Sequence, residues 1–148
     1  MTLTERLAQE IKAAMLAKDA DRLGTLRLLK SALGYAQMER KAESSSDTEF
    51  VAIVQKEVKK RRDAIEQFEK GGRPELAAHE RAEAVVLETF LPVALAPEEL
   101  EALVRAVIQE VGATTKKDMG AVIKAVQAKA AGRADGKSIS TLVGRLLP

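Results

Sequence analysis

The stretch that decides the fold is Phe90–Leu100, which reads Phe-Leu-Pro-Val-Ala-Leu-Ala-Pro-Glu-Glu-Leu. Pro92 cannot continue a helix, and it also disfavours helical backbone at the preceding residue, so the helical pattern before it must end here. Pro97 suits the first position of a new helix, and the two glutamates that follow suit the positive end of the helix dipole. We therefore predict a short joint between two helical domains, in which the apolar side chains of Val93 and Leu95 are partly covered.

Charge divides the chain at the same place. Residues 1–96 contain 16 basic and 16 acidic residues, and residues 97–112 contain one arginine and four glutamates. Residues 113–148 carry seven basic residues against two acidic ones, a net charge of +5. The formal charge of the whole chain is only +2, so the basic character is local. A local excess of this kind favours a polyanionic partner.

Helix-forming residues dominate the 148-residue chain, and strand-type alternation is absent. Composition therefore predicts an all-α protein. The chain has no cysteine, which excludes a disulfide framework and a thiolate nucleophile. The amino terminus lacks the apolar core of a secretory signal, and no apolar run approaches the roughly 20 residues that span a bilayer. We expect a cytoplasmic protein that does not bind membranes.

About four helices are predicted before the joint and three after it, giving an amino-terminal helical domain at residues 1–92 and a helical bundle at residues 97–148. Capping boxes and glycines supply half of the boundaries. The first four helices begin at Thr2, near Asp19–Asp21, at Ser46 and at Pro74, and the third ends at Gly71–Gly72. The last three begin at Pro97, after Thr115 and after Ser138, and the first two of these end at Gly112 and Gly132.

The sequence offers no constellation typical of catalysis, metal binding or cofactor binding. The only histidine, His79, is interpreted as a surface residue. A dense basic run on the third helix comprises Lys56, Lys59, Lys60, Arg61 and Arg62. Acidic residues follow at helical spacing, so a self-paired solvated face is favoured over an RNA contact. Arg61 falls within the apolar stripe, where it either snorkels to solvent or meets a carboxylate.

Lys117 and Lys124 are the strongest candidates for contact with a polyanion. A helical projection places them opposite the apolar stripe and beside Ala121 and Ala128, whose small side chains leave room for a broad surface. An alanine-rich solvated face explains the same pattern, and geometry alone does not separate the two interpretations. The full candidate set is Lys116, Lys117, Lys124, Arg133 and Lys137.

These residues also carry a resemblance to a known family. The order Phe-Leu-Pro, then Lys-Lys-Asp-Met-Gly at 116–120, then Gly-Arg-Ala-Asp-Gly-Lys at 132–137 resembles the GatB/YqeY family. Leu26–Lys30 and Gly72–Leu76 are also similar to YqeY proteins. The resemblance implies that residues 97–148 correspond to the tail of the B subunit of the tRNA-dependent amidotransferase, which helps to hold tRNA.

Two functions from different classes follow. The resemblance favours a tRNA-binding accessory module, with a family label of carbon–nitrogen ligase activity that uses glutamine as amido-nitrogen donor, although no autonomous active site is visible. The partners it implies are tRNA or another structured RNA and a protein of the aminoacyl-tRNA pathway. The alternative is a helical protein–protein adaptor. Salt dependence separates the two, because only RNA binding requires release of condensed counterions.

Overall fold

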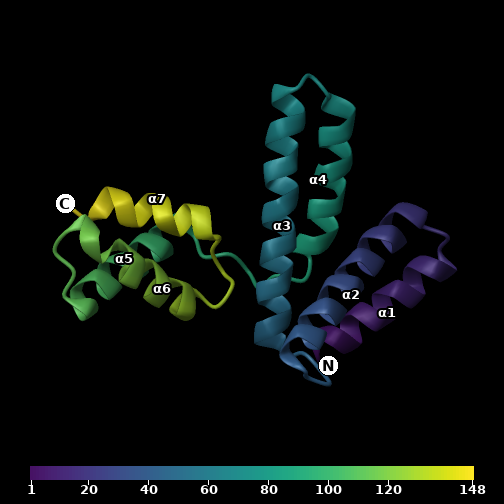
Figure 1. Ribbon diagram of the computed structural model, residues 1–148, viewed down its shortest axis with the longest axis horizontal. Coiled ribbons are helices and arrows are strands. Elements are labelled where there is room, and N and C mark those ends of the chain that lie inside the picture. Colours follow the sequence, from purple (N-terminus) through teal and green to yellow (C-terminus); the bar gives the residue numbers. More distant parts are fainter. The chain divides into compact units, whose positions relative to one another are not determined.

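The computed structural model describes residues 1–148 and confirms the all-helical fold class (Figure 1). It contains seven α-helices, one short 3₁₀ helix and no strand. The helices are α1 (Leu3–Leu16), α2 (Ala20–Arg40), α3 (Asp47–Lys70), α4 (Pro74–Glu88), α5 (Pro97–Val111), the 3₁₀ helix η1 (Lys116–Asp118), α6 (Met119–Ala130) and α7 (Gly136–Leu146). The chain divides into two compact units, Met1–Leu91 and Pro92–Pro148.

The first unit contains two antiparallel helix pairs, α1 with α2 and α3 with α4 (Figure 1). Its core joins the two pairs, and the largest fully buried side chains in it include Leu26, Leu29, Phe50 and Leu87. The core ends near the middle of α3, because Val58 is its last member on that helix. Beyond this point α3 and α4 continue as a two-helix hairpin.

The second unit is a bundle of α5, α6 and α7 around a core of valine, leucine and isoleucine side chains. Val104, Val107, Val122, Val126 and Val143 are completely buried. The clean apolar spacing along α5 predicted its buried face, and Gly112 ends that helix with φ +74°, a left-handed conformation that glycine adopts without steric cost.

Side-chain caps fix the helix starts that the sequence predicted. Thr2 and Glu5 exchange two hydrogen bonds of 3.1 Å at the start of α1. Ser46 and Glu49 do the same at the start of α3, at 3.1 and 3.2 Å. The start of α7 was predicted after Ser138 but lies earlier: Asp135 caps the helix, and its carboxylate accepts a 2.7 Å hydrogen bond from the Ser138 N–H. Helix α7 therefore begins at Gly136.

Gly24 and Gly34 lie inside α2, and a Cβ atom added to either would meet no heavy atom within 4 Å. Glycine in a helix interior costs about 0.5–1 kcal/mol relative to alanine. We therefore expect Gly24→Ala and Gly34→Ala each to raise the free energy of unfolding by about that amount in urea denaturation. Gly72→Ala is the matched control: its Cβ also meets open space, but φ is +69°. Alanine is strained there, so this variant should lose stability.

Candidate nucleic-acid interface

Apart from Arg133, the basic side chains of the second unit fall into two groups, with and without a carboxylate partner. Arg145 binds Glu101 at 2.6 Å and Arg105 binds the same carboxylate at 3.5 Å, while Lys129 pairs with Glu110. The second group comprises Lys116, Lys117, Lys124 and Lys137, all exposed and none within ion-pair distance of a carboxylate. These four ammonium groups are called the free lysines below. All four belong to the predicted candidate set.

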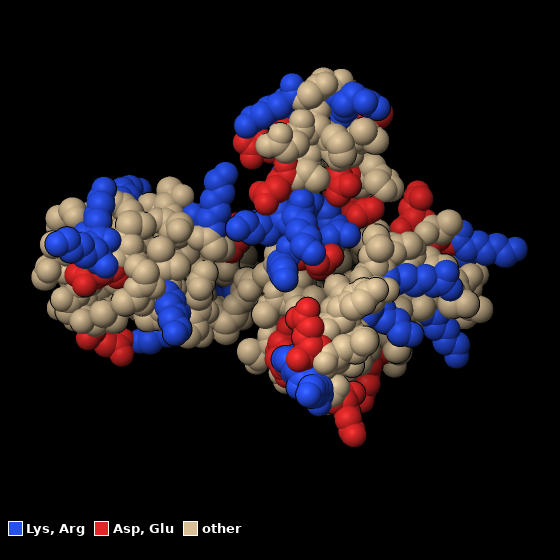
Figure 2. Space-filling view, in the orientation of Figure 1, with Lys and Arg blue, Asp and Glu red and all other residues tan.

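The acidic side chains nearest to them in sequence are already engaged. Between residues 113 and 148 the acidic residues are Asp118 and Asp135. Asp118 accepts hydrogen bonds from the backbone N–H groups of Thr114 and Thr115 at 3.0 and 3.3 Å. Asp135 caps α7. Because both carboxylates serve helix starts, the free lysines keep their positive charge uncompensated, and Figure 2 shows blue side chains outnumbering red ones on this unit.

Lys116 and Lys117 lie on η1, a separate turn that precedes α6. The sequence had placed Lys117 on the same continuous helix as Lys124, but α6 begins only at Met119. The cause is local: Thr115 caps η1 by accepting a 3.3 Å hydrogen bond from the Lys117 N–H, and Asp118 closes the turn. The angular position predicted for Lys117 on a helical projection therefore does not apply.

Lys124 occupies the exposed face of α6, as predicted. Val122 and Val126 are completely buried on the opposite face, whereas Ala121, Lys124 and Ala128 are exposed. The small methyl groups beside Lys124 leave its ammonium group accessible to a broad, rigid surface.

Arg133 has a structural role that sequence reasoning missed. Its Nε donates a 2.9 Å hydrogen bond to the Val93 carbonyl, and its own carbonyl accepts a 2.8 Å hydrogen bond from the Leu95 N–H. Both bonds lie within the second unit and tie the joint to the loop between α6 and α7. Leu95 is half-buried against that core, but Val93 is 82% exposed, so the expectation that Val93 is partly covered was wrong. Backbone hydrogen bonds, rather than burial of both apolar side chains, hold the joint.

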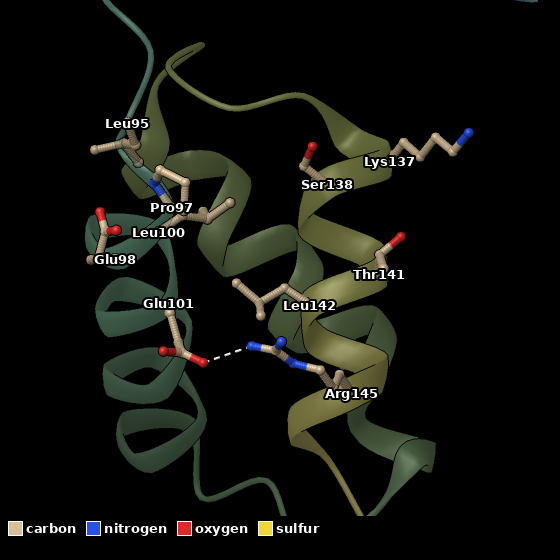
Figure 3. A pocket seen from close by; sticks show the side chains of 10 residues that line it. All are labelled: Leu95, Pro97, Glu98, Leu100, Glu101, Lys137, Ser138, Thr141, Leu142 and Arg145. Atoms are coloured by element: carbon tan, nitrogen blue, oxygen red, sulfur yellow. Dashed lines mark hydrogen bonds and ion pairs between the residues drawn. The ribbon is translucent and has the colours of Figure 1, made fainter.

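Lys137 stands at the rim of a groove between α5 and α7 with a volume of about 690 Å³ (Figure 3). Leu95, Leu100 and Leu142 supply its apolar lining, and Leu142 points across the groove toward α5. The Lys137 side chain extends away from the groove. The Glu101–Arg145 ion pair bridges the two helices at the other end.

Ser138 and Thr141 also line the groove, and neither belongs to the predicted candidate set. Lys137, Thr141 and Arg145 follow one another at intervals of four residues, so they share one side of α7. The sequence shows that spacing. That these residues border a groove could not be predicted, because the groove forms only where α7 packs beside α5.

Three residues of the basic run of α3 form ion pairs, and several of their partners differ from the carboxylates that follow the run in sequence. Lys60 binds Glu57 at 3.1 Å, and Arg62 binds Glu88 of α4 at 3.3 Å. Arg61, in the apolar stripe, meets two carboxylates, Glu57 and Glu83, each at 3.0 Å. Figure 2 shows blue and red side chains interspersed over this hairpin. Lys56 and Lys59 have no ion-pair partner and are the exception.

Glu57 illustrates how the pairing controls titration. Burial by itself would raise the pKa of its carboxyl, but hydrogen bonds from Lys60 and Arg61 and the positive charges of both outweigh this effect. The pKa of Glu57 therefore lies below its ordinary value of 4.5.

His79 is exposed on α4 with its Nε2 3.0 Å from the Glu83 carboxylate. No group of His, Cys, Asp and Glu side chains is arranged to hold a metal ion.

Comparison with known proteins gives one family and several relatives. The family described as Yqey-like protein matches residues 4–147. An uncharacterized protein of Schizosaccharomyces pombe is 31% identical over 86 residues, which cover 58% of this chain and 69% of that protein. Altered inheritance of mitochondria protein 41, mitochondrial, of Eremothecium gossypii is 33% identical over 111 residues, or 73% of this chain and 60% of that protein.

The protein of the same name from Kluyveromyces lactis is 34% identical over 101 residues, which cover 66% of this chain and 54% of that protein. The chain therefore spans little more than half the length of these two mitochondrial relatives. None of the seven α-helices combines the length and the hydropathy that a bilayer span requires.

Proposed function

The chain belongs to the YqeY-like protein family, and from this premise we propose that it is a tRNA-binding accessory protein that contacts RNA through the free lysines of its second unit. The YqeY family is related to the carboxyl-terminal region of the amidotransferase B subunit. By that relation the chain holds a folded tRNA, and a partner protein of the aminoacyl-tRNA pathway carries out the amide-forming chemistry.

The observation that supports the proposal best is the charge of the second unit. Four exposed ammonium groups have no carboxylate partner, and both acidic side chains of residues 113–148 are occupied as caps. Such charges attract a polyanion, and each phosphate that a lysine neutralises releases condensed counterions. Arg133 belongs to the same candidate set, but its hydrogen bond to Val93 makes it an anchor of the joint as well as a cation.

The kind of RNA follows from the side chains that the second unit contains. All four aromatic residues of the chain, Tyr35, Phe50, Phe68 and Phe90, lie in the first unit. Readers of single strands usually stack bases on aromatic rings, which the second unit does not provide. Lysines contact phosphates without reading sequence. The proposal therefore favours the surface of a folded tRNA over a single strand, with weak sequence discrimination.

The test compares two double variants by fluorescence anisotropy with a labelled tRNA. Lys117→Ala with Lys124→Ala should weaken binding about tenfold or more. It should also lower the slope of log binding constant against log salt concentration by about one to two, because fewer counterions are released. Lys56→Ala with Lys59→Ala removes the same charge from exposed lysines of α3 that also lack ion pairs, and it should bind nearly as the parent does.

Three outcomes contradict the proposal: no tRNA binding by the parent at low salt, parent-like binding by the Lys117 and Lys124 variant, or equal losses in the two variants. A single-stranded oligonucleotide of matched length serves as competitor. If it displaces tRNA as effectively as unlabelled tRNA does, the preference for a folded RNA is wrong.

A further inference from the structure

Helix α2 exposes large apolar side chains along one face. Leu28, Tyr35 and Met38 are 49%, 70% and 74% exposed. At 100° per residue these three positions fall within an arc of about 80° on the helix, and they extend over about 15 Å of its length. The core-facing side of the same helix is distinct, because Leu26 and Leu29 are completely buried. The exposed apolar residues are thus additional to those that the fold requires.

Two glycines extend the same face. Gly24 lies about 40° from Leu28 in projection, and Gly34 lies within about 40° of Met38. Neither glycine has positive φ, and a Cβ at either position would contact nothing in this chain. The fold therefore gives no reason for the missing side chains, although they destabilise the helix. What they provide is space in which another backbone can approach α2 closely.

The basic and acidic residues beside this face lie on opposite sides of it. Arg27 and Lys30 are exposed and form no ion pair, and both project to the same side of the apolar arc, about 20° and about 80° beyond its edge. Asp21 and Glu39 project to the other edge, near the two ends of the helix. An occupant that complements the middle of the face must present apolar side chains beside negative charge.

We propose that this face of α2 binds an amphipathic helix of another protein, whose apolar side chains cover Leu28, Tyr35 and Met38 and whose Asp or Glu side chains pair with Arg27 and Lys30. Recognition by an amphipathic helix uses apolar anchors at helical spacing. The face lies in the first unit, so the proposal does not depend on RNA binding by the second unit.

A second copy of the chain fits the same face less well. Antiparallel pairing of two α2 helices about a two-fold axis would bring basic edge against basic edge. Parallel pairing would bring basic edge against acidic edge, but Asp21 and Glu39 lie at least six residues, about 9 Å, along the axis from Arg27 and Lys30. Neither arrangement neutralises the two cations, whereas an acidic partner helix does.

The experiment is a selection from a phage library of random peptides of about 16 residues against the immobilised full-length chain, with a Leu28→Ser, Tyr35→Ser, Met38→Ser variant as the counter-target. The peptides enriched on the parent alone should share apolar residues at helical spacing together with Asp or Glu. Binding of the best peptide, measured by fluorescence anisotropy in the presence of nuclease, should weaken at least tenfold in Tyr35→Ser.

Two further variants make the assignment specific. The Arg27→Glu, Lys30→Glu variant should not bind the acidic peptide. It should bind a peptide in which those acidic residues are changed to lysine. Gly24→Ala with Gly34→Ala should weaken the peptide at least fivefold while raising the melting temperature of the chain. A loss of binding in a variant that is more stable than the parent does not come from misfolding.

Several results overturn the proposal. These are the absence of enriched peptides, enrichment of basic or wholly polar peptides, and equal binding of the best peptide to the Tyr35→Ser variant. A dimer in light scattering that Tyr35→Ser dissociates would assign the face to a second copy. Displacement of the peptide by tRNA or by anionic phospholipid vesicles would assign it to RNA or to a membrane surface.

Discussion

Replacing Phe90 with alanine is expected to lower the free energy of unfolding by about 3–5 kcal/mol, the usual cost of removing a fully buried aromatic ring. Phe90 is 2% exposed, and its ring centroid lies 5.6 Å from that of Phe50. The guanidinium carbon of Arg6 lies 4.5 Å from the centroid of the Phe90 ring, and the same guanidinium donates a 2.8 Å hydrogen bond to the Thr89 carbonyl. The ring thus holds the end of α4 against α1 and α3.

The measurement is thermal unfolding followed by circular dichroism. A loss of this size should lower the midpoint for the first unit by roughly 15–30 °C. Val93→Ala is the matched control, because Val93 lies three residues further along the chain and is 82% exposed. That variant should stay within about 0.5 kcal/mol of the parent. Equal midpoints for the two variants would show that Phe90 does not belong to the core.

Replacing Arg61 with alanine is expected to destabilise the first unit by about 3 kcal/mol or more, because it leaves two largely buried carboxylates without their shared cation. The side chains of Arg61, Glu57 and Glu83 are only 10%, 11% and 14% exposed. Arg62→Ala is the control on the adjacent residue. Its ion pair with Glu88 joins side chains that are 48% and 42% exposed, and pairs of this kind contribute about 0–1 kcal/mol.

The same variant should change the pH dependence of stability. In the parent, the pKa of Glu57 is lower in the folded state than in the unfolded state, so its contribution is present above pH 4.5 and is lost as the pH falls through the folded-state pKa. Burial raises the pKa of Glu57 and the Arg61 charge lowers it, so the pKa rises when Arg61 is removed. Denaturation in urea from pH 7 to pH 3 should therefore show a smaller acid-induced loss in Arg61→Ala than in the parent. An equal loss would contradict the role assigned to Arg61.

Local signals predicted most of the fold. The spacing of apolar residues along α5 and the capping box at Thr2 each act within about one to four helical turns, where the sequence itself contains the interacting groups. The tie between Arg133 and Val93 could not be predicted in this way, because it joins residues 40 positions apart. The exposure of Val93 also became evident only in the folded chain, where its carbonyl and not its side chain is held by the second unit.

The candidate site was predictable in its charge and less so in its geometry. An excess of lysine is visible in the sequence, but which lysines remain unpaired depends on helix neighbours such as Glu110 beside Lys129, 19 residues away. Arg61 shows an intermediate case. Its position in the apolar stripe of α3 indicated an unusual environment, while its partner Glu83 on α4 became evident only in the folded chain.

The distribution of aromatic rings has a spectroscopic consequence. The chain contains one tyrosine and no tryptophan, and that tyrosine is the 70% exposed Tyr35 of α2. Tyrosine emission therefore comes from a single site on the proposed docking face. A helix that covers α2 should alter the emission and its quenching by iodide, whereas RNA bound only to the second unit should leave tyrosine quenching unchanged. An unlabelled protein thus carries its own optical reporter for one of its two proposed binding surfaces.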